Sequence, residues 1–244
     1  MYRILLLFFL LCGQSAISQQ LPDDLQDSTY QDAKAFFYAQ IGSDAHLYTG
    51  INYPNYDPVI KGDPFLGGDQ VQNGTVLYDG TLYRDIPLQY DIVSQKILIN
   101  RYQQHFRITL VGSKVAWFDL PGHHFEHPAP GPGFASVDTA GFVDLLIPGK
   151  IALLARRIKK IQKGLHPEDP IFFSREDLFY LRKDGTYYPL TSKASLLDAL
   201  NDQRAALKTF LRRHHLKVSR KNKNTNESVY RSAVTYYLTL KAER

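Results

Sequence analysis

The residues best suited to metal chemistry stand together just after position 120. His123, His124 and His127 place three imidazoles within five residues, with Glu126 between them. Imidazole nitrogen is a good ligand for zinc, copper or nickel, and Asp119 could complete a ligand set. The H-H-x-x-H spacing lacks the second-position glutamate of zincins. The segment therefore predicts either a metal site at these three histidines or a solvated histidine-rich loop.

A basic stripe near the C-terminus is the second candidate, because residues 204–223 hold eight basic residues and no acid. Such a stripe could meet anionic lipid head groups or other anionic surfaces. No aromatic residue interleaves with it, so base stacking and sequence-specific nucleic-acid recognition are not indicated. The alternative is a solvated helix face. The candidate anion-binding residues are Arg204, Lys208, Arg212, Arg220 and Lys221.

Catalytic signatures are missing from the sequence. Asp79 and Asp91 could pair as acid and base, but a turn at each position accounts for both residues. The chain contains no G-x-S-x-G elbow, no phosphate-binding glycine loop and no dinucleotide fingerprint. We therefore predict no catalytic residues and no cofactor, and the sequence favours a protein that is not an enzyme.

The first eighteen residues have the pattern of a signal peptide. Arg3 is followed by an uninterrupted apolar run at residues 4–11, and residues 16–18 read Ala-Ile-Ser. The apolar run is shorter than the roughly 20 residues that a membrane-spanning helix needs. We predict cleavage near Ser18 and export to the periplasm or beyond. Cleavage there would remove Cys12, the only cysteine, so the mature chain would form no disulfide.

The remainder, residues 19–244, is expected to form a single β-rich domain of α+β class with a C-terminal helical segment from about residue 192. Sixteen tyrosines and fourteen phenylalanines favour strands. We expect an antiparallel β-meander, either a curved sheet, a sandwich or a half-barrel. An N-terminal helix and two or three C-terminal helices should accompany it. Strands are predicted at 75–78, 82–91, 97–99, 106–110, 115–120, 142–147, 178–181 and 187–190. Helices are predicted at 28–41, 193–200, about 202–215 and from about 226, with Ser192, Asp202 and Asn226 as possible caps.

Three segments are less regular. Residues 46–70 are rich in Pro and Gly, and their aromatic side chains should tie a structured loop to the sheet. Residues 121–133 are expected to form a loop of thirteen residues. Residues 151–161 fit either a helix or a long basic edge strand; we predict the strand, since edge strands often carry Lys and Arg.

Several short motifs resemble a family of uncharacterised exported proteins from Bacteroidota-type bacteria, and the resemblance spans most of the predicted mature chain. It implies export and a β-rich architecture, and no activity. The motifs are Leu47-Tyr48-Thr49-Gly50 with the tyrosines that follow, Lys61-Gly62-Asp63-Pro64-Phe65, Gly74-Thr75-Val76-Leu77-Tyr78-Asp79-Gly80, Leu88-Gln89-Tyr90-Asp91, Gly141-Phe142, Tyr187-Tyr188 and Ser192-Lys193.

These observations together favour an exported, non-enzymatic envelope protein. It would bind a partner, either another envelope protein or a small apolar ligand, through the curved sheet and its helices. The first alternative is a metal-binding protein or metal-dependent hydrolase that uses the histidines. The second is a surface protein that binds anionic groups through residues 204–223.

Overall fold

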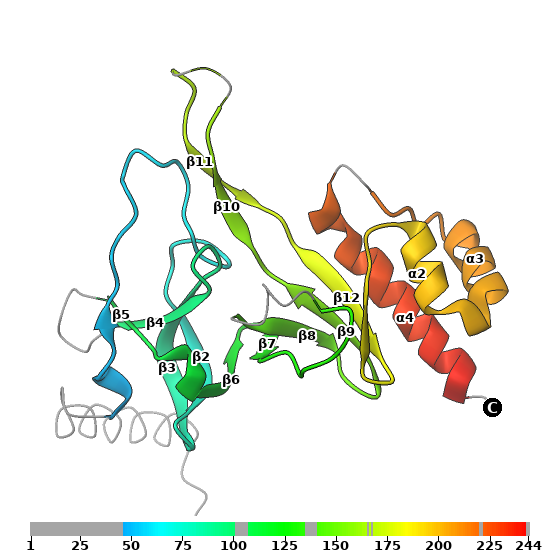
Figure 1. Ribbon diagram of the computed structural model, residues 1–244, viewed down its shortest axis with the longest axis horizontal. Helices are drawn as coiled ribbons and strands as arrows, with labels where there is room; N and C mark the ends of the chain where they lie inside the picture. Colours follow the sequence, from blue (N-terminus) through cyan, green and yellow to red (C-terminus); the bar gives the residue numbers. More distant parts are fainter. Residues whose placement is uncertain are drawn as a thin grey trace, which may run out of the picture. The chain divides into compact units, whose positions relative to one another are not determined.

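The computed structural model describes residues 46–100, 107–134, 141–164, 166, 168–219 and 222–242. In this part the chain forms a curved, open antiparallel sheet of 11 strands, a separate two-stranded ribbon and three C-terminal helices (Figure 1). The predicted α+β class is therefore confirmed. The predicted signal peptide and the predicted helix at 28–41 lie outside the described residues. No helix in the described part is long and apolar enough to span a membrane.

The large sheet has the strand order β1-β5-β4-β3-β2-β6-β7-β8-β9-β12-β13, and β10 pairs with β11 in the ribbon. The strands are β1 (Ile51–Asn52), β2 (Gln72–Tyr78), β3 (Thr81–Asp91), β4 (Lys96–Asn100), β5 (Arg107–Thr109), β6 (Val115–Leu120), β7 (His123–Glu126), β8 (Val143–Ile147), β9 (Ile151–Arg156), β10 (Lys159–Gln162), β11 (Phe172–Arg175), β12 (Leu178–Lys183) and β13 (Thr186–Pro189). The helices are α2 (Lys193–Ala199), α3 (Arg204–Arg213) and α4 (Glu227–Ala242).

Local turn chemistry fixes two of the hairpins. Asp79 and Gly80 connect β2 to β3 with φ angles of 49° and 77°, and Asp184 and Gly185 connect β12 to β13 with 50° and 75°. Two consecutive positive φ angles match the right-handed twist of the flanking strands, and Asp-Gly adopts them at low cost. The strands predicted on either side, 75–78 with 82–91 and 178–181 with 187–190, pair across these two turns.

The segment 121–133 is not one long loop, and that prediction is wrong. Its first part is a tight turn followed by β7, which pairs with β6 on one side and β8 on the other. Gly122 supplies the positive φ of 79° that the turn requires. Phe125 is fully buried and stacks on Phe118 with 4.6 Å between ring centroids. This buried ring between polar neighbours is the period-two pattern of a half-buried strand.

The segment 151–161 is extended, as predicted, but its first part, β9, is not an edge strand, and only its second part, in β10 of the two-stranded ribbon, is one. The extended segment is interrupted at Arg157 and Ile158, which belong to neither strand. As a result, β9 lies in the large sheet and β10 lies in the ribbon. β9 lies between β8 and β12, and its residues from Ala152 to Arg156 are buried. The basic residues of this segment concentrate at the interruption between β9 and β10 and in the ribbon, where their charges can be paired or solvated.

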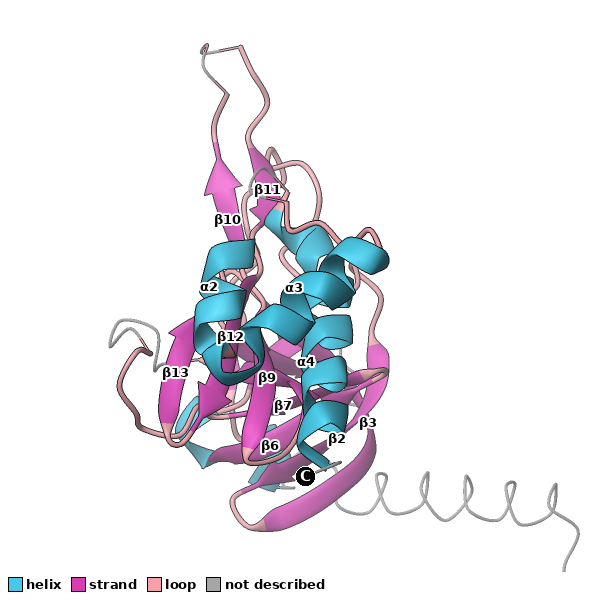
Figure 2. Cartoon of the chain, turned by 90° about the vertical axis from the view of Figure 1, so that its right-hand side faces the viewer, coloured by secondary structure: helices cyan, strands magenta, loops and turns pink. Residues whose placement is uncertain are grey.

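The three helices cover one face of β8, β9 and β12, as Figure 2 shows from the helical side. The buried leucines of α2 and α3 pack against Leu153 and Leu181 of the sheet. The start of α2 is fixed by a capping box, in which the Ser192 hydroxyl accepts a hydrogen bond from the Ser195 amide at 3.1 Å. Apolar side chains therefore fill the space between these helices and the sheet.

Asp202 does not cap α3, and that prediction is wrong. Its carboxylate instead accepts hydrogen bonds from the Tyr237 hydroxyl at 3.1 Å and from Lys183 at 3.3 Å, and it pairs with Lys241 at 2.6 Å. Burial acts to raise the pKa of Asp202, but the hydrogen bonds from Lys241, Lys183 and Tyr237 outweigh burial and lower the pKa to about 2. Asp202 thus joins the start of α3 to β12 and α4.

We expect Asp202→Asn to lower the free energy of unfolding by about 1 kcal/mol at neutral pH, a value reduced for the partial exposure of the site. A carboxyl whose folded pKa is depressed stabilises the fold above its ordinary pKa of 3.8 and loses that effect as pH falls through about 2. The difference between wild type and variant should therefore shrink over this acidic range. Urea unfolding at a series of pH values measures it, with the more exposed Asp198→Asn as control. A difference that does not depend on pH would contradict the assignment.

Candidate functional site

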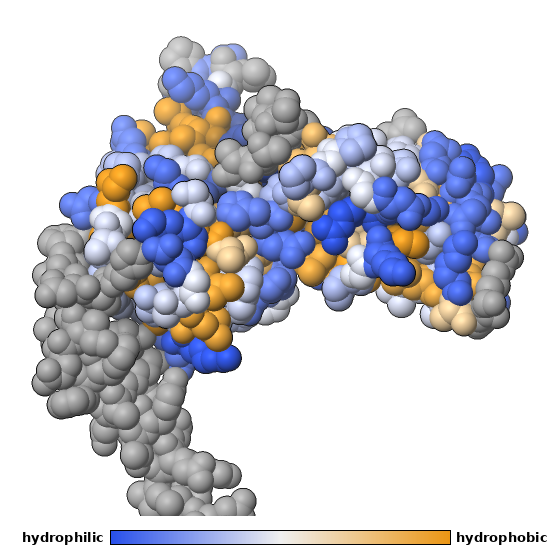
Figure 3. Space-filling view, turned by 60° about the horizontal axis from the view of Figure 1, so that its bottom comes forward, coloured by the Kyte–Doolittle hydropathy of each residue, from blue (hydrophilic) through white to orange (hydrophobic). Residues whose placement is uncertain are grey.

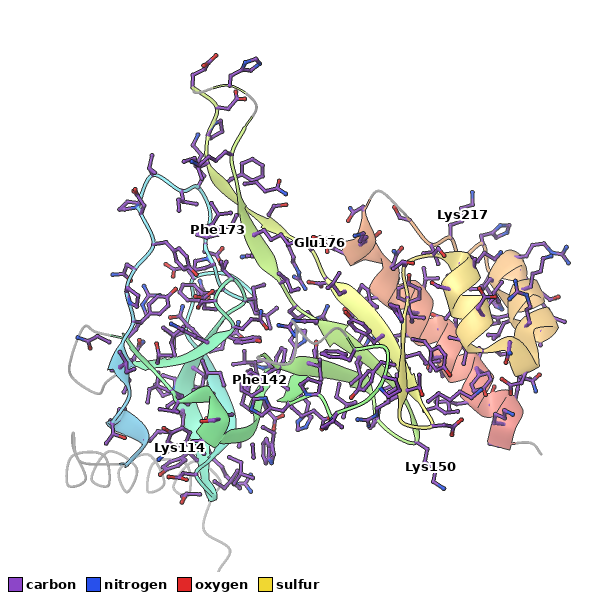
Figure 4. The ribbon with its side chains drawn as sticks, in the orientation of Figure 1. Lys114, Phe142, Lys150, Phe173, Glu176 and Lys217 are labelled. Carbon is purple, nitrogen blue, oxygen red and sulfur yellow. The ribbon has the colours of Figure 1, made fainter. Side chains whose placement is uncertain are left out.

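A surface pocket of about 460 Å³ lies where the loop between β1 and β2 meets β5 and the ribbon. We call residues 53–71 the pocket loop and this cavity the aromatic pocket. Phe173 contributes an aromatic ring from the ribbon strand β11 (Figure 4), and the other aromatic residues of the lining belong to the pocket loop. The lining residues are Tyr53, Asn55, Tyr56, Asp57, Pro58, Ile60, Gly62, Asp63, Pro64, Phe65, Asp69, Arg107 and Phe173.

A buried carboxylate holds two of the rings in place. Asp91, at the end of β3, is fully buried. Its Oδ2 accepts hydrogen bonds from the hydroxyls of Tyr53 at 2.9 Å and Tyr56 at 3.0 Å. Its Oδ1 accepts from the backbone amides of Val93 at 2.8 Å and Ser94 at 3.0 Å, which is the turn role predicted from the sequence. Asp91 thus anchors the pocket loop to the sheet.

A second anchor joins the pocket loop to the ribbon. The Lys159 ammonium donates to the Asp63 carboxylate at 2.9 Å and to the backbone oxygens of Asp63 and Phe65 at 2.8 Å each. Lys61 forms an isolated bridge with Phe172, so the loop runs beside β11. These contacts fix both walls of the aromatic pocket relative to each other, which predisposes the pocket to bind without rearrangement.

The rings and one cation form a connected group. The Arg107 guanidinium lies over Phe65 at 5.1 Å from the ring centroid and near Tyr53 at 6.0 Å, distances that allow cation–π attraction. Tyr56 meets Phe173 edge to face at 5.3 Å. Arg107 also donates from Nη1 to Gln89 at 3.2 Å. The guanidinium is thereby held close to the aromatic wall.

The tyrosines of the pocket stay protonated over the physiological range. Burial, followed by the charge of Asp91, raises the pKa of Tyr56 to about 12 and raises the pKa of Tyr53 further. Because both hydroxyls donate to Asp91, the two tyrosines contribute their rings to the pocket.

The structure does not bring the three histidines together. Strand alternation places His123 and His124 on opposite faces of β7. His123 Nδ1 lies 2.7 Å from Asp144, and His124 Nδ1 lies 2.6 Å from Asp119. His127 Nε2 lies 3.2 Å from the Gly112 carbonyl oxygen. Among the described residues no group of three or more His, Cys, Asp or Glu side chains could hold a metal ion.

The basic residues of α3 lie on its solvent face. Arg204, Lys208 and Arg212 are exposed, while Leu207 and Leu211 on the opposite side are buried. Arg204 forms an ion pair with Asp198. Arg220 and Lys221 lie outside the described residues. Hydrophilic residues gather over the helical part of the surface at the right of Figure 3, where α3 lies in Figure 1.

A buried charge network was not predicted. Arg157 is 1% exposed and contacts the carboxylates of Asp144 at 2.5 Å, Asp177 at 2.7 Å and Glu227 at 2.8 Å. We call these four residues the Arg157 cluster. Burial would lower the pKa of Arg157, but the nearby carboxylates, led by Asp144, outweigh burial and raise it. The cluster connects Arg157, between β9 and β10, to Asp144 in β8, to Asp177 just before β12 and to Glu227 in α4.

Sequence reasoning found part of the aromatic pocket. The aromatic, Pro- and Gly-rich segment after residue 46 was expected to be a loop tied to the sheet, and Tyr53, Tyr56 and Phe65 confirm this. Motifs at 61–65 and 88–91 that carried the family resemblance also meet at the pocket. Arg107 and Phe173 were missed, because no local pattern distinguishes them from other strand residues.

No protein-family model, curated protein or solved structure matches this chain.

Proposed function

We propose that this chain is an exported, non-enzymatic binding protein whose ligand site is the aromatic pocket. The observation that carries the proposal is the anchoring of Tyr53 and Tyr56 by the buried Asp91, because it fixes one wall of an open pocket before any ligand arrives. A concave site with aromatic walls and a few placed polar groups is the usual form of a small-molecule site.

The position of this site differs from the sequence-based expectation. That expectation assigned the binding of a partner or apolar ligand to the curved sheet and its helices, and the space between these is filled by a shared core in which Leu196, Leu200 and Leu207 are fully buried. The proposal therefore uses the pocket loop and ribbon instead. Export rests on the apolar N-terminal segment and its small residues before Gln19. Finding the protein in the cytoplasm with this segment retained would remove the export part of the proposal.

Binding can be tested with a mixed small-molecule library observed by ligand NMR. We expect ligands that bind wild type to lose at least about tenfold in affinity with Phe173→Ala, because one aromatic wall is removed. Phe172→Ala is the matched control: it removes the neighbouring ring, which points to the other face of the ribbon. A library without binders, or equal losses in the two variants, would reject the aromatic pocket as the ligand site.

A further inference from the structure

The aromatic pocket presents ring faces and edges rather than tyrosine hydroxyls. The hydroxyls of Tyr53 and Tyr56 are directed to Asp91, so the ligand meets the carbon surface of the rings. Phe173 adds a ring that carries no polar atom, and Phe65 lies almost fully buried under the Arg107 guanidinium. Such walls suit a ligand with at least one flat apolar face.

The polar lining consists of planar groups with paired hydrogen-bonding atoms. Asn55, Asp57, Asp69 and Arg107 each offer two or more such atoms in one plane. Within the described residues this set keeps further hydrogen-bonding capacity, because Asp57 uses Oδ1 for the Val59 amide and Arg107 donates to Gln89 from Nη1. Neighbouring hydroxyl groups, which both donate and accept, fit such paired atoms in two-point contacts.

The charge of the lining disfavours anions. The Lys159 ammonium balances the charge of the Asp63 carboxylate. The remaining charges of the lining are the two carboxylates of Asp57 and Asp69 and the one guanidinium of Arg107. Asp69 lies 3.6 Å from Arg107 and its side chain is 71% exposed, so it faces an incoming ligand. A carboxylate or phosphate ligand would therefore meet like charge at the rim of the pocket.

We infer that the ligand of the aromatic pocket is a neutral saccharide. A pyranose ring combines a flat face of C–H groups with a rim of adjacent hydroxyls, and it carries no charge. The aromatic rings of the pocket fit the flat C–H face, and the planar polar side chains fit the adjacent hydroxyls. The net acidic charge of the lining favours a ligand without negative charge. This inference rests on the proposed function, since it names the ligand class of the same site.

The test is isothermal titration of the full chain with neutral methyl glycosides and short neutral oligosaccharides, each paired with its uronic-acid counterpart. We expect at least one neutral sugar to bind with a Kd in the micromolar to millimolar range. The matched uronate should bind about tenfold or more weakly. Phe173→Ala should abolish the neutral-sugar signal, and Phe172→Ala should retain it. Asp69→Asn should reduce the difference in affinity between the neutral sugar and the uronate, because it removes a negative charge at the rim of the pocket.

The outcomes separate the inference from the function on which it rests. Failure of every neutral sugar to bind, or a uronate that binds as tightly as its neutral partner, overturns the saccharide assignment. If a non-saccharide ligand from the library then binds wild type and is lost with Phe173→Ala, the pocket is still a binding site and only its ligand class is wrong. If no ligand of any class depends on Phe173, both proposals fall.

Discussion

Arg157→Met is expected to lower the free energy of unfolding by about 3–5 kcal/mol, the largest loss that we predict for a single substitution. The guanidinium balances the carboxylates of Asp144, Asp177 and Glu227. Methionine fills a similar volume but leaves these acids without their shared cation, in a site where Asp144 and Asp177 are almost fully buried. Denaturant unfolding followed by circular dichroism measures the loss.

Arg204→Met is the matched control, because Arg204 also pairs with an acid but is exposed, as is Asp198. We expect it to cost at most about 1 kcal/mol. Adding Asp144→Asn and Asp177→Asn to Arg157→Met should recover part of the loss, since without Arg157 the buried Asp144 keeps, among the described residues, only its contact with His123 and the buried Asp177 only its pair with Arg175. Equal effects of Arg157→Met and Arg204→Met would show that the Arg157 cluster does not stabilise the fold.

Asp91→Ala is expected to have the second largest effect, a loss of about 3 kcal/mol together with loss of ligand binding. The substitution removes the acceptor of the Tyr53 and Tyr56 hydroxyls and of the Val93 and Ser94 amides. The pocket loop would keep its backbone contacts with β3, but the rings of Tyr53 and Tyr56 would lose the acceptor that fixes their position. Denaturant unfolding measures the loss of stability, and titration with a ligand that binds the wild-type protein measures the loss of binding.

Two further variants sharpen this prediction. Asp91→Asn keeps one acceptor oxygen and should retain part of both stability and binding. Asp57→Ala removes a single exposed bond to the Val59 amide and should change stability by less than about 1 kcal/mol. If Asp91→Ala unfolded at the same denaturant concentration as Asp57→Ala, the anchoring role of Asp91 would be refuted.

Sequence patterns predicted the elements whose causes are local. Asp79-Gly80 and Asp184-Gly185 specify their hairpins because the required backbone angles are a property of the dipeptide itself. Ser192 begins α2 because its hydroxyl reaches an amide three residues on. The Asx turn at Asp91 has the same origin, since its Oδ1 contacts lie two and three residues away.

Patterns misled where tertiary pairing overrode composition. Pro, Gly and His near residue 123 indicated a loop, but the burial of Phe125 between β6 and β8 makes this segment a strand. The charges of Arg156 and Arg157 indicated an exposed edge, but Arg157 is buried because three carboxylates from distant segments surround it. A basic residue can be buried at moderate cost only where such partners exist.

By itself, then, the sequence determined the α+β class, the hairpin turns and the start of α2, together with a Pro- and Gly-rich aromatic loop. Only the tertiary structure decided where that loop lies and what it forms. Tyr53 reaches Asp91 across 38 residues, and Lys159 reaches Asp63 across 96. The physical reason is the range of the interactions. Turns and caps depend on neighbouring residues, whereas the aromatic pocket and the Arg157 cluster form only when strand pairing brings distant segments into contact.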